Sequence, residues 1–171
     1  MLRLFHISEE ENIEKFNPRI SKKQWNNKML YVWAISEQKL HNYLLPRNCP
    51  RICINMGQSS ILKELLPLEE IQNRKSIIIV PENWKSSIQN CILYKYQFKK
   101  QNFKLIDKIA GYYVSTKTES PIHKVKIKNC IKELDELNVE LKIVDKIKML
   151  KIKEKIVENL EEFSIIKWSN F

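Results

Sequence analysis

The sequence of 171 residues contains only two glycines, Gly57 and Gly111. The loops that hold phosphate groups in dinucleotide-binding Rossmann folds and in P-loop NTPases need several closely spaced glycines, because the backbone must approach the phosphate directly. The sequence contains neither loop. Any nucleotide that this chain binds must therefore be held by side chains and by the backbone of strands.

The length and the apolar fraction of 43% are typical of one globular domain, so we expect residues 1–171 to form a single domain. The N-terminus lacks the apolar region and the small-residue cleavage site of a secretory signal. No apolar run approaches the roughly 20 residues of a membrane span. We therefore expect a cytoplasmic protein that does not associate with membranes. The sequence leaves the oligomeric state open.

The pattern of apolar residues predicts strands over 2–7, 29–35, 51–56, 75–80, 91–98, 112–115 and 139–144. Two helices are expected directly after the first two strands, over 8–16 and 36–45, with Ser8 and Ser36 as N-caps. Further helices are expected over 59–66, 122–137 and 148–162, with one helical turn around Trp84. The expected fold class is therefore α+β, with a split antiparallel or mixed sheet and two C-terminal helices.

The cysteines and histidines show no spacing that is typical of a metal site or a disulfide framework. We expect no metal, and we expect the four cysteines to be reduced and mostly buried. The cysteines are Cys49, Cys53, Cys91 and Cys130, and the histidines are His6, His41 and His123.

Two segments of the chain resemble each other at an offset of 28 residues. FHISEEENIEKFNPR ends at Arg19 and WAISEQKLHNYLLPR ends at Arg47. Each is expected to leave a strand, enter a capped helix and stop at a proline. Two helix N-termini at one sheet edge would attract an anion, because their N–H groups lack partners within the helix.

Arginine is rare in this chain, with five residues among thirty basic ones. Three arginines, Arg19, Arg47 and Arg51, directly follow a proline, where chance predicts roughly 0.2 such pairs. An arginine in a lysine-rich chain suggests that the planar guanidinium is needed, for a phosphate, a carboxylate or an aromatic face. The alternative is structural: the guanidinium groups tie loop carbonyls and acidic side chains together.

The formal charge of +10 supports a second interpretation. The excess of lysine is spread along the chain rather than gathered in one segment. It is compatible with a non-catalytic basic module that binds RNA, DNA or a partner protein.

The segments LFHIS and VWAISEQKLHNY resemble the NAD site of the diphtheria-toxin-like ADP-ribosyltransferase superfamily. That site opens on a strand that ends in a histidine and a small polar residue, and a later helix ends in an Asn-Tyr pair. The related RNA 2′-phosphotransferases use a histidine and several arginines. The whole chain also resembles an uncharacterised bacterial family of small proteins with FHxSE, VWA, YLLPR, CPR and GYYVS segments, which carries no established activity.

The first resemblance implies a nucleotide- or NAD-binding domain in which NAD is a substrate and the transferred group is glycosyl or phosphoryl. His6 would bind the ribose on the nicotinamide side, and Arg19, Arg47 and Arg51 would complete the candidate catalytic set. The implied ligand-binding residues are Ser8, Tyr31, Trp33, Tyr43 and Tyr113. An aromatic residue such as Trp33, however, more often occupies a core position than a stacking one.

Two features depart from the superfamily pattern. Val32 replaces the tyrosine of its Tyr-Phe-Ala strand, and the glutamate that many transferases use has no obvious match. Glu82 and Glu119 are candidates by position only. The sequence therefore leaves open whether chemistry takes place, and which acceptor would be used.

Overall fold

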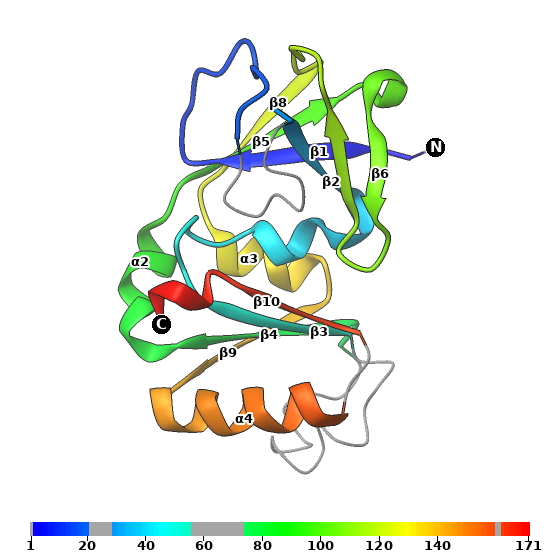
Figure 1. Ribbon diagram of the computed structural model, residues 1–171. Helices are drawn as coiled ribbons and strands as arrows, with labels where there is room; N and C mark the ends of the chain where they lie inside the picture. Colours follow the sequence, from blue (N-terminus) through cyan, green and yellow to red (C-terminus); the bar gives the residue numbers. More distant parts are fainter. Residues whose placement is uncertain (1, 21–28, 56–73, 160–161) are drawn as a thin grey trace. The chain divides into compact units, whose positions relative to one another are not determined.

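The computed structural model describes residues 2–20, 29–55, 74–159 and 162–171. The chain divides into two compact units and passes between them repeatedly (Figure 1). Unit 1 comprises Met1–Tyr43 and Ile92–Lys128, and unit 2 comprises Leu44–Cys91 and Asn129–Phe171. Each unit has its own sheet. The single domain remains a prediction.

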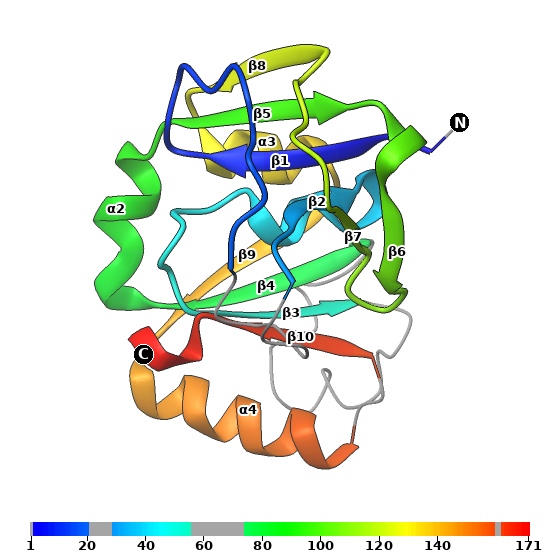
Figure 2. The ribbon, with the colours of Figure 1, turned by 45° about the horizontal axis from the view of Figure 1, so that its top comes forward.

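Unit 1 is built on an antiparallel sheet in which each strand pairs with its neighbours in the order β6-β7-β2-β1-β5-β8. Figure 2 shows β1 and β5 running side by side. One face of this sheet packs against Phe16, which the preceding loop lays over Leu4, Tyr96 and Phe98. The elements are β1 (Leu4–Ser8), β2 (Val32–Ser36), η1 (Glu37–Tyr43), β5 (Leu93–Phe98), η5 (Lys100–Asn102), β6 (Lys104–Asp107), β7 (Tyr112–Ser115) and β8 (His123–Ile127).

Unit 2 is built on a mixed sheet in the order β10-β3-β4-β9, with β4 parallel to β9 and the other pairs antiparallel. Its elements are β3 (Arg51–Asn55), β4 (Ser76–Pro81), η4 (Glu82–Trp84), α2 (Lys85–Asn90), α3 (Cys130–Glu136), β9 (Val139–Val144), α4 (Lys146–Asn159), β10 (Phe163–Ile166) and η6 (Trp168–Asn170).

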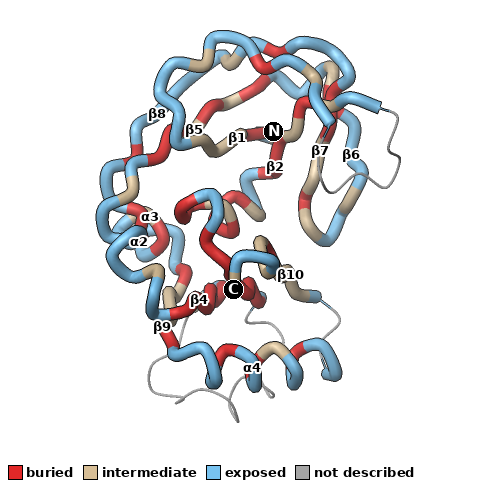
Figure 3. Tube along the Cα trace, turned by 60° about the vertical axis from the view of Figure 1, so that its left-hand side comes forward, coloured by how far each residue is buried: buried red, intermediate tan, exposed pale blue. Residues whose placement is uncertain are grey.

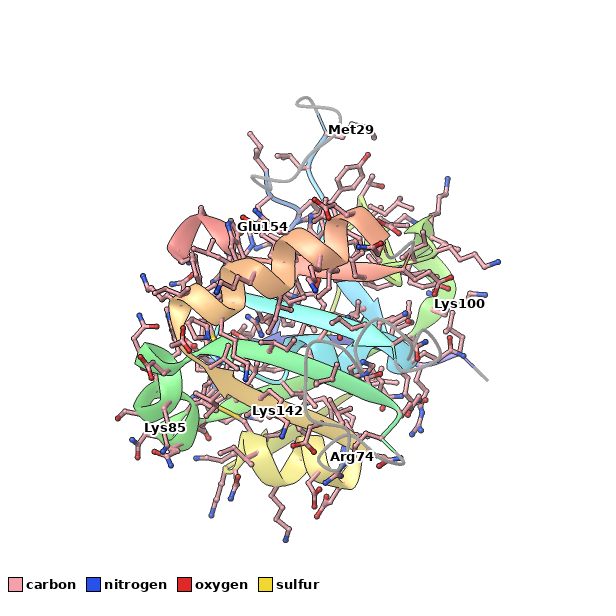
Figure 4. All side chains as sticks on the ribbon, turned by 90° about the horizontal axis from the view of Figure 1, so that it is seen from below. Met29, Arg74, Lys85, Lys100, Lys142 and Glu154 are labelled. Carbon is pink, nitrogen blue, oxygen red and sulfur yellow. A yellow bond between two sulfur atoms is a disulfide. The ribbon has the colours of Figure 1, made fainter. Side chains whose placement is uncertain are left out.

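The core of unit 2 lies between its sheet and α4. Helix α4 crosses one face of the sheet (Figure 4) and buries Met149, Ile152 and Ile156 against it. Strand β4 is buried along its whole length (Figure 3). Near the C-terminus, Trp168 stacks on Phe171 with ring centroids 4.3 Å apart, and Lys153 and Lys146 of α4 lie over these rings.

The predicted α+β class is confirmed, and strands occur in all seven predicted segments. The helix predicted over 36–45 is the shorter 3-10 helix η1, and the last predicted helix is α4, which begins two residues early. Asp145 explains that start, because its Oδ1 accepts the N–H of Lys148 at 2.8 Å. Strands β6 and β10 were not predicted, and residues 59–66 lie outside the described part of the chain.

The helix predicted over 8–16 is wrong, because this segment forms no helix. The Oγ of Ser8 accepts the N–H of Glu10, which makes a local turn instead of a helix cap. The Tyr96 hydroxyl then lies 2.7 and 2.5 Å from the carbonyl oxygens of Glu10 and Glu11 and accepts the N–H of Ile13. A tyrosine that is distant in sequence thus takes the backbone groups that a helix would have paired.

The helix predicted over 122–137 is also wrong in its first half, which forms β8. The residues His123–Ile127 pair with Leu93–Gln97 of β5, and both Lys124 and Lys126 place their ammonium groups over the Tyr94 ring. The helix α3 starts only after Asn129, whose side chain accepts the N–H of Lys132 at 3.0 Å. The pairing with β5 decides the conformation of a segment whose apolar spacing also suits a helix.

The prediction of four reduced cysteines is wrong for two of them. Cys91, directly after α2, forms a disulfide with Cys130, the first residue of α3. The two positions are 39 residues apart in sequence, so their spacing gives no local signal of pairing. Cys49 and Cys53 are buried and lie outside the disulfide.

Gly111 is required by the turn that leads into β7. Its φ of 70° is a conformation that side chains disfavour. A Cβ at this position would lie 2.5 Å from the Oγ of Ser36 and 2.9 Å from the Cγ of Lys39. The Gly111 carbonyl also accepts the N–H of Ser36. The close approach of this turn to the end of β2 therefore depends on the missing side chain.

We expect Gly111→Ala to lower the free energy of unfolding by about 2 kcal/mol or more, because the left-handed conformation and the close contacts both disfavour the methyl group. Urea unfolding followed by circular dichroism measures the change. Ile109→Ala, in the same turn and half exposed, is the control and should cost less than about 0.5 kcal/mol. Equal stabilities of the two variants would contradict the role given to Gly111.

Candidate ligand-binding site

His6 and Trp33 are brought together by the pairing of β1 with β2. The Nδ1 atom of His6 lies 2.9 Å from the carbonyl oxygen of Trp33. Because a carbonyl can only accept, Nδ1 carries the proton in this contact. The other side of the ring packs against Phe16, with centroids 4.9 Å apart. The imidazole is thus oriented from two sides.

A small cavity of about 30 Å³ lies next to this histidine. Arg19 reaches it through an isolated bridge in which it and Tyr31 exchange two backbone hydrogen bonds of 3.1 Å. A volume of this size holds roughly two water molecules, so it takes a hydroxyl or an oxyanion rather than a whole nucleotide. The cavity is lined by His6, Phe16, Asn17, Arg19, Tyr31, Val32 and Trp33.

Four aromatic side chains continue from the cavity in one connected group, which we call the aromatic set: Tyr31, Trp33, Tyr112 and Tyr43. Successive ring centroids are 6.3, 5.6 and 6.1 Å apart, and all three contacts are edge-to-face. The hydroxyls of Tyr43 and Tyr112 are hydrogen-bonded to each other. All four residues are half-buried. Three of the five predicted ligand-binding residues therefore lie together.

The indole of Trp33 has an unusual feature. Its Nε1 atom is buried and has no hydrogen-bond partner among the residues that the structure describes. Most buried polar groups are paired, and leaving one unpaired costs about 1–3 kcal/mol. A water or a ligand acceptor beside this N–H would remove the cost.

The other two predicted ligand-binding residues lie elsewhere. Tyr113 packs against the core cluster that contains Leu4 and Phe16, while the adjacent Tyr112 belongs to the aromatic set. Successive strand residues point to opposite faces, so a shift of one position separates the two tyrosines. Ser8 holds the turn described above with its Oγ.

Arg47 and Arg51 belong to unit 2, whereas His6 and Arg19 belong to unit 1. Arg51 is only 2% exposed. Its Nε donates to the carbonyl of Cys49 at 3.1 Å, and its Nη2 lies 3.0 and 3.4 Å from the carbonyls of Pro46 and Arg47. This arrangement matches the structural alternative for the Pro-Arg pairs. Arg47 is exposed.

We expect Arg51→Lys to lower the free energy of unfolding by about 3 kcal/mol, because an ammonium group cannot replace the planar donors at these carbonyls. Arg47→Lys, which changes an exposed side chain in the neighbouring Pro-Arg pair, should cost less than about 0.5 kcal/mol. Chemical unfolding of both variants measures the difference. A loss below about 1 kcal/mol for Arg51→Lys would show that the guanidinium is not needed by the loop.

Nucleophilic chemistry at Cys49 and metal binding find little support in the described residues. Burial raises the pKa of the Cys49 thiol to about 11, although the positive charge of Arg51 acts in the opposite direction. This thiol is therefore protonated at neutral pH and a poor nucleophile. In the part of the chain that the structure describes, no group of three or more His, Cys, Asp or Glu residues could hold a metal ion.

The family model DUF6886, a family of unknown function, matches residues 5–171. The chain belongs to this family. The match covers both units and agrees with the expected membership in an uncharacterised family. Comparisons of this DUF6886 chain with curated proteins and with solved structures gave no significant match. Among the described residues, no helix is long and apolar enough to cross a membrane.

Sequence reasoning missed three residues that line the cavity in this DUF6886 chain, namely Phe16, Asn17 and Val32, and it chose Tyr113 rather than the adjacent Tyr112. The first two were assigned to the end of a helix and its stop, and only the long-range bridge between Phe16 and Glu119 places them beside His6. Tyr112 could have been found from the pairing of β7 with β2, which is not visible in the sequence.

Proposed function

We propose that this DUF6886 chain binds a nucleotide or an NAD-like, phosphate-bearing ligand on unit 1. The observation that carries the proposal is that the aromatic set shares two of its members, Tyr31 and Trp33, with the cavity next to His6 and Arg19. Half-buried aromatic rings bind the flat faces of bases and of nicotinamide. A guanidinium neutralises a phosphate without a glycine-rich loop.

The parts of the site suit different parts of such a ligand. The cavity accommodates one hydroxyl or one phosphate oxygen, with the Arg19 guanidinium as the cation and the His6 imidazole as a polar partner. The rings of the aromatic set offer a surface for the base. The Trp33 N–H supplies a donor to an acceptor on that ring. Arg47 and Arg51 are not needed for this arrangement.

The enzymatic form of the proposal is a divergent transferase that resembles the ADP-ribosyltransferases or the RNA 2′-phosphotransferases. The adjacent antiparallel strands β1 and β2, with His6 hydrogen-bonded to Trp33, support the resemblance of LFHIS and VWAIS to that superfamily. The departures remain. Glu119 is buried, and its Oε1 accepts the Ser115 hydroxyl at 2.6 Å, while Glu82 belongs to unit 2. The proposal therefore puts binding first and glycosyl or phosphoryl transfer second.

Calorimetric titration of the full chain with NAD⁺, ADP-ribose and a 2′-phosphorylated RNA oligonucleotide tests this proposal. We expect one of the three to bind, and Arg19→Gln to weaken it about tenfold because a charge-assisted hydrogen bond is lost. Trp33→Phe should weaken it by a smaller factor, since an aromatic ring is kept while the indole N–H and its five-membered ring are lost.

Lys104→Gln is the matched control, since it removes one exposed positive charge from β6 of the same unit. It should leave the affinity within about twofold, as expected for a screened surface charge. The proposal fails if the unmodified chain binds none of the three ligands. It also fails if Arg19→Gln and Lys104→Gln weaken binding equally, because the effect would then be one of net charge.

A second candidate function rests on α4. This helix carries five lysines and two glutamates in fourteen residues, and Lys148, Lys151 and Lys155 are exposed on one side of it. If the chain is a basic nucleic-acid-binding module, its affinity for RNA or DNA should fall steeply with salt. Replacing these three lysines by glutamine should reduce the slope of the logarithm of affinity against the logarithm of salt concentration by about three in magnitude. Arg19→Gln should change this slope by about one at most. An unchanged slope in the triple variant would exclude α4 as the contact surface.

A further inference from the structure

The disulfide between Cys91 and Cys130 lies where the chain leaves unit 2 and where it returns to it. Unit 2 ends its first segment at Cys91 and resumes at Asn129, so the bond closes the segment Ile92–Lys128, which belongs to unit 1. This segment supplies β5, β6, β7 and β8, and with β7 it supplies Tyr112 of the aromatic set. The two cysteines therefore flank this segment of unit 1.

The strands next to the disulfide form a ladder that starts beside it. Leu93 of β5 pairs with Ile127 of β8, two residues after Cys91 and three residues before Cys130. Among the described residues, β8 pairs with β5 alone and forms an edge of the sheet. His123–Lys126 are all exposed. An edge strand with little buried surface frays easily, so a covalent link at its end has the largest effect there.

The two cysteine residues differ in how far they are exposed to solvent. Cys91 is half-buried, whereas Cys130 is 1% exposed. A small-molecule disulfide can therefore reach Cys91 first, and Cys130 is placed to complete the reaction. Disulfides in reducing compartments are mostly transient and redox-sensing. For such a pair, the effect on the neighbouring strands β5 and β8 matters more than a permanent gain in stability.

We propose that Cys91 and Cys130 form a reversible redox clip that fixes the edge strand β8 onto β5. The Cys91 thiolate attacks one sulfur of glutathione disulfide and releases one glutathione thiolate, which leaves a mixed disulfide on Cys91. The Cys130 thiolate then attacks the Cys91 sulfur and releases the second glutathione. Two cysteine thiols are oxidised, glutathione disulfide is reduced by two electrons, and the two protons end on the two glutathione molecules. The clip is independent of the proposed ligand.

The chemical part of the test is a thiol count. The full chain is equilibrated with glutathione buffers of different oxidation, quenched in acid, denatured and labelled with a maleimide. We expect four labels at the reducing end and two at the oxidising end, and mass spectrometry should place the lost labels on Cys91 and Cys130. Cys91→Ser and Cys130→Ala should each abolish the change of two labels. Four labels at every ratio would overturn the proposal.

The structural part of the test is native-state hydrogen exchange of both forms. In the oxidised form the amides of β8 should exchange at least about tenfold more slowly than in the reduced form, because the bond holds the adjoining ends of β5 and β8 together. The edge strand β6 is the matched control, since it lies at the other edge of the same sheet and is not next to the bond. The thermal midpoint should also rise by roughly 10 °C for a closed loop of 39 residues.

The clip model is overturned if β8 exchanges at the same rate in both forms. It is equally overturned if β6 and β8 change by the same factor, because the bond would then act on global stability alone. Cys91→Ser in reducing and oxidising buffers provides the baseline, and this variant removes a half-buried side chain from outside the strands and helices. In this variant the amides of β8 should exchange at the same rate in the reducing and the oxidising buffer.

Discussion

The antiparallel pairing of β1 with β2 on one side and with β5 on the other is the constraint on which unit 1 depends. The pairing with β2 puts His6 within reach of the Trp33 carbonyl, and the pairing with β5 puts Tyr96 opposite His6. Tyr96 then holds the loop after β1 through its hydroxyl. That loop carries Phe16 over the core and Arg19 to the cavity. A single register therefore fixes the histidine, its backbone partner and the loop that supplies the cation.

The two faces of the same sheet carry different aromatic groups. Phe16 and Tyr113 pack with the core cluster, whereas Tyr112, one residue earlier, joins Trp33 and Tyr43. Gly111 makes this possible, because it lets the turn before β7 approach Ser36 closely. The GYYVS segment thus supplies a turn, a member of the aromatic set and a core residue in three successive positions.

The sequence was sufficient to predict seven strands, since β-branched and aromatic runs mark the buried ones, but not the more exposed strands β6, β8 and β10. It was insufficient for 8–16 and 122–137, where local capping and apolar spacing favour helices and long-range partners decide otherwise. The Tyr96 hydroxyl pairs the backbone of the first segment, and β5 pairs the second. For the site, the candidates His6, Tyr31 and Trp33 were found, but Phe16 was not, and Tyr113 was chosen in place of Tyr112, because strand order cannot be derived from one sequence.

The Pro-Arg pairs show why one motif can serve two purposes in a lysine-rich chain. In Arg51 the guanidinium is buried and donates to loop carbonyls, so the planar donors stabilise unit 2. Arg19 is exposed beside a cavity. Its backbone, not its side chain, makes the bridge to Tyr31. The guanidinium of Arg19 therefore contributes nothing to that bridge, and the proposed function assigns it to the phosphate of the ligand.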